Sequence, residues 1–433
     1  MTGRHPSHQP ALSPLLARRS FLPLFITQFL GAFNGNLFKN AAIVLILYRL
    51  GSEQESGGKV LATLALALFV LPFFLFSATA GQIADRFDKT RVIQASKLLE
   101  LAAAVVAAIA LAWGAPAMLL TALFLLGAQA ALFGPLKYGI LPELLAENDL
   151  LGANGLIEAA TFLAILAGTI MGSLTVLGTD GVLIIQSTVI VAAAAGWIAS
   201  LAIPPTQAKA PGLSLDWNFP RLTWSLLRET SGPSSLLGLI MGVSWFWLAG
   251  ATYLTQFPAF AKDALHAGPD VVSLFLGMFS LGICAGSLLC QRLFRGRASL
   301  RLAPYGLLAM AVFGLDFVLS AQPLGNIDGD FAGIADFLAV PQSWHLLADL
   351  LAIAIASAIY VVPLYTLLQQ RAAPSHRARV IAANNVMNAL FMTVAAGLAA
   401  MLLGTGLGIK GLLGGMAAAN IAVAALFYRW KSA

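Results

Sequence analysis

The sequence predicts an all-α membrane protein with twelve transmembrane helices in two six-helix bundles. Of its 433 residues, 59% are hydrophobic and 10% are charged, whereas a soluble domain has about 25% charged residues. Apolar runs near the length of about 20 residues that a membrane-crossing helix needs occur twelve times, and the longest polar, proline-rich interruption divides them six and six. Such a chain cannot cover itself with polar surface, which excludes a soluble enzyme, a nucleic-acid-binding domain and a disordered protein.

The predicted organisation is an N-terminal tail (1–20), a first bundle (21–203), a linker (204–232) and a second bundle (233–430). The first apolar run is too long and too rich in asparagine for a cleaved signal peptide, so we expect it to remain as the first span. The expected spans are 21–49, 60–84, 92–114, 116–140, 150–178, 181–203, 233–261, 269–291, 302–321, 344–370, 380–405 and 409–428.

The formal net charge of +6 is explained by topology. Lysine and arginine are retained on the cytoplasmic side during insertion, and 19 of the 25 basic residues lie in the termini and the even-numbered loops or at their edges. Arg49, Lys59, Lys262 and Lys410 lie on the opposite side. We therefore expect both termini in the cytoplasm, membrane lipids beside the basic loops, and no nucleic-acid partner.

The two bundles resemble each other in sequence. Residues 153–159 (ANGLIEA) reappear as 383–389 (ANNVMNA), and a Pro-Leu step at Pro135 has a counterpart at Pro363. Two parallel repeats of six spans are the plan of the major facilitator superfamily of transporters. The sequence therefore predicts the major facilitator fold.

The loop after the second span resembles the loop 2–3 motif of that superfamily, G-x-x-x-D-R-x-G-R-R. Here it reads GQIADRFDKTR, with Asp88 where the motif has glycine. Gly81 permits close helix packing, Asp85 can cap the next helix or pair with an arginine across the bundle interface, and Arg86 and Arg91 hold the loop in the cytoplasm. We assign these four residues to a conformational switch; the alternative is an ordinary basic loop.

Polar side chains within the spans are the candidate binding residues, because hydrocarbon makes them costly unless they face a cavity or a partner. In the first span, Asn36, Lys39 and Asn40 share one helical face, and Asn34 lies nearby. A lysine here requires an anion, or else snorkels to the interface. The candidate anions for Lys39 are a substrate phosphate, Glu100 and Glu158.

Glu158 lies about two turns into the fifth span, without a basic residue within one turn. A proton or cation site, an acceptor for a substrate ammonium group, and a structural partner of Lys39 or Lys137 are the alternatives, and we favour a functional role. Taken alone, Lys137 fits a charge snorkelling at the end of the fourth span. The further substrate-binding candidates are Lys137, Tyr138, Asn154, Tyr253, Gln256, Tyr365, Asn384 and Asn388.

Motifs of catalysis and metal binding are absent from the sequence. H-E-x-x-H, G-x-S-x-G and P-loop patterns do not occur. Cys284 and Cys290 lie six residues apart on one expected helix, on different faces, and the five histidines fall in loops or at span ends. We expect no enzymatic activity, no cofactor and no metal site.

Four segments resemble the bacterial lysophospholipid transporter family, the LplT branch of the major facilitators, over about residues 21–430. They are QFLGAFNGNLFKNA, GQIADRFDKTRVI, FGPLKYGILPELL with ANGLIEAATFLAILAGTIMG, and VVPLYTLLQQRA with ARVIAANNVMNALF. The family's first span usually has an aspartate where this chain has Gly35.

The resemblance implies transport of lysophospholipids, such as lyso-phosphatidylethanolamine, by alternating access. The transfer would run from the outer to the inner leaflet of the bacterial inner membrane, in a monomer linked functionally to an acyltransferase/acyl-ACP synthetase that re-acylates the lipid. Lys39 would then meet the phosphate and Glu158 the ammonium group. Two other functions stay open: a cation-coupled exporter of amphipathic drugs or small solutes, and a membrane-embedded accessory subunit of an acyltransferase.

Overall fold

The computed structural model describes residues 15–50, 55–230, 236–323 and 331–432. Parts of the predicted tail, linker and bundles fall outside these residues. Within them the chain is helical without a strand, and one isolated bridge joins Ala267 to Ala332. Twelve described helices are long and apolar enough to cross a membrane, which confirms the predicted fold class.

The twelve spans agree with the expected ranges to within three residues at every boundary. The transmembrane helices are α2 (Leu22–Leu45), α3 (Glu55–Arg86), α4 (Lys89–Trp113), α5 (Pro116–Gly139), α7 (Leu150–Thr175), α8 (Gly181–Leu201), α10 (Leu236–Ala259), α11 (Pro269–Leu293), α12 (Ala303–Ser320), α14 (Pro341–Arg371), α15 (Arg377–Gly404) and α16 (Ile409–Ser432). The shorter helices are α6 (Leu141–Leu144), α9 (Phe219–Thr230) and α13 (Ile334–Ala339).

Local sequence explains where several helices begin and end. Proline occupies the first turn of α5, α11 and α14, where it removes no intrahelical hydrogen bond. The side chain of Asp88 caps α4 by accepting a hydrogen bond from the Thr90 backbone N–H at 2.9 Å. Gly114 ends the same helix in the left-handed conformation, at φ 60°. The aspartate that replaces the motif's glycine is thus the residue that starts α4.

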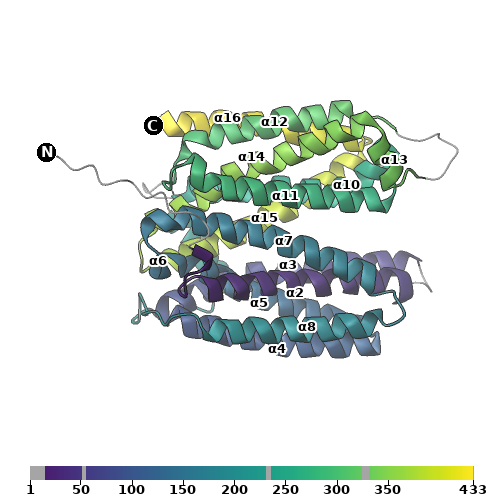
Figure 1. The fold of residues 1–433 in the computed structure, drawn as a ribbon. Helices are drawn as coiled ribbons and strands as arrows, with labels where there is room; N and C mark the ends of the chain where they lie inside the picture. Colours follow the sequence, from purple (N-terminus) through teal and green to yellow (C-terminus); the bar gives the residue numbers. More distant parts are fainter. Residues whose placement is uncertain (1–14, 51–54, 231–235, 324–330, 433) are drawn as a thin grey trace.

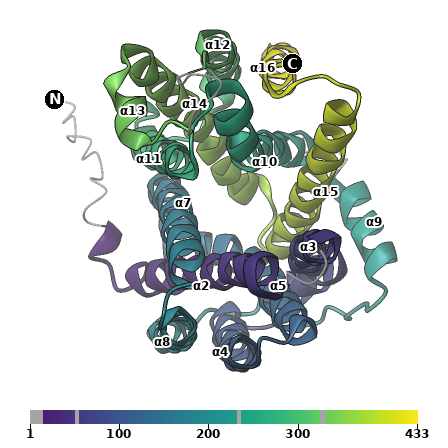
Figure 2. The same ribbon diagram turned by 90° about the vertical axis from the view of Figure 1, so that its right-hand side faces the viewer.

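The helices form two halves, which Figure 2 shows nearly end-on. In the first half, α2 packs against α7 and α8, while α5 packs against α3 and α4. In the second half, α14 packs against α11 and α12, α12 against α16, and α10 against α15. The halves meet where α7 packs against α11 and where α3 packs against α15.

The linker crosses one end of this helical assembly. Its backbone N–H groups at Lys209 and Ala210 donate hydrogen bonds to the carbonyl oxygen of Asp85, at 3.1 and 2.8 Å. Its helix α9 then packs against α3 and α15. We call this end, where α3 ends and α15 begins, the linker end, and the opposite end the far end (Figure 1).

Candidate functional site

The centre of the candidate site is a buried carboxylate on α7. Glu158 is fully buried, and its Oε1 accepts a hydrogen bond from the hydroxyl of Tyr138 on α5. Lys137, also on α5, lies close enough to interact electrostatically with Glu158. Oε2 of Glu158 accepts no hydrogen bond from a described residue. The site therefore holds an anion, a cation and an acceptor with unused capacity.

Two tyrosine rings join this carboxylate to the second half. The ring of Tyr138 stacks on that of Tyr365 of α14, with ring centroids 4.5 Å apart and planes 10° from parallel. The hydroxyl of Tyr365 accepts a hydrogen bond from Trp247 Nε1 on α10 at 2.9 Å. It also interacts with the side-chain amides of Asn384 and Asn388 on α15. Polar groups from five helices, α5, α7, α10, α14 and α15, thus converge between the halves.

An apolar group of rings lies one helical turn along α7 from Glu158. Phe162 contacts Phe246 and Trp247 of α10, with ring centroids 6.0 and 6.3 Å apart. It also contacts Phe279 of α11, at 6.2 Å. A side chain of the first half is therefore surrounded by aromatic rings of the second half. None of these rings was among the sequence-predicted candidates, because single aromatic residues in apolar spans give no positional signal.

One turn in the other direction, Asn154 connects the halves directly. Its Nδ2 donates to Gln369 Oε1 at 2.8 Å and to Thr366 Oγ1 at 3.1 Å, and its Oδ1 accepts from Gln369 Nε2 at 2.9 Å. Residues four apart lie on one helical face. Asn154, Glu158 and Phe162 therefore form one stripe of α7 that faces the second half.

The polar residues of α2 lie in two separate places. Lys39 Nζ donates to Asn36 Oδ1 at 2.8 Å and lies 5.3 Å from the ring centroid of Phe69 on α3. Asn40 donates to Thr169 Oγ1 of α7 at 3.1 Å. Described residues provide no carboxylate within ion-pair distance of Lys39, so neither Glu100 nor Glu158 neutralises it in this conformation.

Asn34 faces a buried ion pair within the first half. Its Nδ2 donates to Glu100 Oε1 at 3.3 Å, and Glu100 Oε2 lies 2.6 Å from Lys97 Nζ. Lys97 also lies 4.7 Å from the ring centroid of Phe133. Glu100 is therefore the partner of Lys97 and not of Lys39, and Asn34 is separated from the rest of the candidate site.

Tyr253 and Gln256 do not contact the central cluster among the described residues. Tyr253 is buried against α12, since a Cβ at Gly314 would lie 2.7 Å from the tyrosine hydroxyl. Among the described residues, the side chain of Gln256 makes one long hydrogen bond, 3.5 Å, to Thr255. Their assignment to a substrate path stays a prediction.

The motif after the second span lies where the halves meet at the linker end. Asp85 is fully buried and accepts hydrogen bonds from the backbone N–H of Ala378 at 3.1 Å and of Arg379 at 3.3 Å. It also pairs with Arg379 Nε at 3.3 Å. A Cβ at Gly81 would lie 2.7 Å from the Cβ of Ala382. Asp85 could either cap the next helix or pair with an arginine across the interface, and in the structure it pairs with Arg379 across the interface.

The basic residues of this motif differ in burial. Arg91 is exposed, 3.9 Å from Asp88, and Arg86 lies over the ring of Phe87. Lys89 is fully buried instead and pairs with Glu143 at 2.8 Å. Lys89 was not among the candidate residues because a basic loop gives no sign of which charge is buried.

Comparison with known proteins agrees with this fold. The profile of the Major Facilitator Superfamily matches residues 24–327. A protein of Serratia proteamaculans (strain 568) named lysophospholipid transporter LplT is 31% identical over 373 residues, covering 84% of this chain and 82% of that protein. A protein of the same name from Shigella sonnei (strain Ss046) is 29% identical over 352 residues, covering 80% of this chain and 79% of that protein.

Solved structures show the same fold at low identity. A bacterial homologue of the iron transporter ferroportin, in an outward-facing state, has a TM-score of 0.69 at 16% identity and covers 95% of this chain and 100% of that chain. The Escherichia coli fucose:proton symporter FucP has a TM-score of 0.67 at 14% identity, and the match covers 96% of this chain and 100% of that chain. The chain is a membrane transporter rather than an enzyme, and it belongs to the lysophospholipid transporter LplT family of the major facilitator superfamily.

Proposed function

We propose that this protein transports lysophospholipids such as lyso-phosphatidylethanolamine from the outer to the inner leaflet of the bacterial inner membrane. It acts as a monomer by alternating access, with both termini in the cytoplasm, and supplies an acyltransferase/acyl-ACP synthetase on the inner side. The names of its relatives support the substrate class.

The observation that carries this proposal is a pair of opposite charges, Glu158 on the stripe of α7 and Lys137 on α5, with a group of aromatic rings one helical turn away. A lysophospholipid has a phosphate, in many cases an ammonium group, and one acyl chain, so its site needs both polar partners and an apolar wall. Glu158, with its free Oε2, suits the ammonium group, and Lys137 suits the phosphate as a point charge. The rings around Phe162 suit the chain.

Lys39 provides a second cation on the same route in this proposal. It lacks a carboxylate partner among the described residues and lies on the face of α2 that carries Asn36 and Asn40. A desolvated cation without an anion favours binding of one. We propose that Lys39 receives the phosphate at a stage of transport different from that served by Lys137.

The contacts at the linker end support a conformation that is open toward the outer leaflet. Asp85 and Asn154 hydrogen-bond across the halves there. The backbones also approach closely, because a Cβ at Gly155 would lie 2.5 Å from the Ser287 carbonyl oxygen. Opening to the inner leaflet requires these contacts to break while the far end closes.

Uptake of labelled lyso-phosphatidylethanolamine into spheroplasts tests the proposal. The double variant K137Q/E158Q removes both charges of the central cluster, and we expect its initial uptake rate to fall at least tenfold at equal membrane abundance. The matched control is E147Q/K262Q, which removes one acid and one base from exposed positions. A rate within twofold of the unaltered protein in the double variant contradicts the proposed site.

The burial of Glu158 keeps a cation-coupled exporter as the second candidate. A fully buried carboxylate with an unused oxygen is suited to carrying a proton or a cation. Such an exporter loses transport when the pH gradient is collapsed, whereas the proposed lipid transporter does not. Retained lipid uptake under collapse therefore decides between the two.

A further inference from the structure

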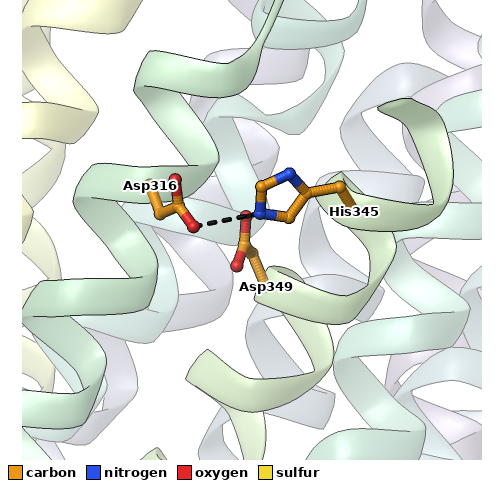
Figure 3. A group of neighbouring side chains, drawn as sticks. All are labelled: Asp316, His345 and Asp349. Atoms are coloured by element: carbon orange, nitrogen blue, oxygen red, sulfur yellow. Dashed lines mark hydrogen bonds and ion pairs between the residues drawn. The ribbon is translucent and has the colours of Figure 1, made fainter. Parts of the chain in front are cut away.

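A histidine and two aspartates converge on the far end of the second half, away from the central cluster. Asp316 lies near the end of α12, and His345 and Asp349 lie four residues apart on α14. Figure 3 shows the imidazole ring directed at both carboxylates. No sequence motif predicts a metal site here. Asp316 is 29 residues from His345, and helix packing brings the two together.

The distances among these side chains are those of metal ligands. His345 Nε2 lies 3.0 Å from Asp316 Oδ2 and 3.6 Å from Asp349 Oδ2, and the ligand atoms of all three lie within 4.8 Å of one another. Ligands about 2.1 Å from a tetrahedral zinc ion are about 3.4 Å apart. Small rotations of exposed side chains therefore suffice to place one ion among the three.

The cluster also has more acidic than basic groups. The Asp349 side chain is 4% exposed, and its Oδ2, the atom nearest His345, accepts no hydrogen bond from a described residue. Among the ion pairs of the described residues, His345 is the only basic partner of either aspartate. Two carboxylates and a neutral imidazole carry a net charge of −2, which a divalent cation neutralises. Asp316 and His345 are about half exposed, so an ion has access to the group.

We propose that Asp316, His345 and Asp349 form a binding site for a divalent transition-metal ion of the zinc type. One imidazole nitrogen and two carboxylate oxygens favour such an ion over magnesium or calcium, which prefer oxygen ligands alone. Water completes the coordination on the exposed side. The ion links α12 to α14, the helix that carries Tyr365, so it stabilises the second half independently of the substrate transported.

Titration of the purified full-length chain in nanodiscs, after removal of bound metal with a chelator, tests this site. The probes are Zn²⁺, competed against a fluorescent chelator, and Co²⁺, whose visible absorption reports a low-coordinate site with mixed ligands. We expect binding of one ion with a micromolar or lower Kd. H345Q and D316N should each weaken binding at least tenfold, and D349N should do so as well.

The control variant is H376Q, which alters a histidine at the linker end and leaves Asp316, His345 and Asp349 in place. We expect it to bind zinc as the unaltered protein does. Since Asp316 and His345 are half exposed, their variants should retain the elution profile of the folded protein. Zinc binding weaker than 100 μM, or binding unchanged by both H345Q and D316N, overturns the proposal, whatever the outcome of lipid uptake.

Discussion

Replacing Asp85 by asparagine should shift the protein away from the conformation described here. Asp85 is buried where α3 meets α15 and accepts three hydrogen bonds from Ala378 and Arg379. The variant D85N keeps the shape of the side chain and one acceptor oxygen. The amide nitrogen, however, is a donor and would face the backbone N–H and the Nε–H of Arg379, so the two hydrogen bonds at Oδ2 are lost.

The expected magnitude follows from those lost bonds. Two charge-assisted hydrogen bonds of 3.3 Å are removed. Bonds to charged groups contribute about 1.5–3 kcal/mol each, and their length places these two at the lower end, for about 3 kcal/mol together. Since 1.4 kcal/mol is tenfold in an equilibrium constant, the ratio of the two conformations should change on the order of 100-fold.

Distances between spin labels across the linker end measure this ratio. The labels are attached to cysteines introduced at Phe87 and Ala373, after Cys284 and Cys290 have been replaced. They report the separation of the end of α3 from the start of α15. We expect a short distance to dominate in the parent and a longer one in D85N. D180N, which alters an exposed aspartate at the far end, is the matched control. An unchanged distance distribution in D85N refutes the assignment of Asp85 as a contact that holds this conformation.

Three further predictions follow from single positions. G155V should lengthen the same spin-label distance, since its side chain would collide with an α11 carbonyl oxygen. G397A, which has open space around it, should leave that distance unchanged. Y365F should lower lipid uptake several-fold and change the fluorescence of Trp247, because the phenyl ring cannot accept the indole hydrogen bond. Burial raises the pKa of Asp88, but hydrogen bonds from a linker threonine and backbone N–H groups outweigh it and hold the pKa below its ordinary value. The resulting stabilisation of the docked linker is present above about pH 4 and is lost as pH falls through the lowered pKa. Pepsin should therefore cut the linker faster at pH 2 than at pH 4.5. The variant D88N should weaken this pH dependence.

The span boundaries could be predicted from the sequence because hydrophobic length and proline position are local properties. Pro116, Pro269 and Pro341 mark helix starts that the structure retains. The contact of Asp85 with an arginine was an open alternative, but nothing local identified Arg379 as the partner. A partner 294 residues away depends on how the two halves pack.

The same limit applies to the charges inside the membrane. Lys39 and Lys97 both lie within spans. Among the described residues only Lys97 has a carboxylate partner, and that partner is its helical neighbour Glu100. Lys137 fits a snorkelling helix end by position, whereas the structure brings it close enough to Glu158 for an electrostatic interaction. Position in a span indicates that a charge needs a partner; only the packing of helices determines which partner it has.

Transfer of labelled lyso-phosphatidylethanolamine between leaflets by the purified chain alone, in liposomes without ion gradients, is the most direct test of the proposed function. The account predicts protein-dependent transfer that persists when the pH gradient is absent and that K137Q/E158Q reduces at least tenfold. Transfer no faster than in protein-free liposomes, or transfer that requires a proton gradient, would contradict it.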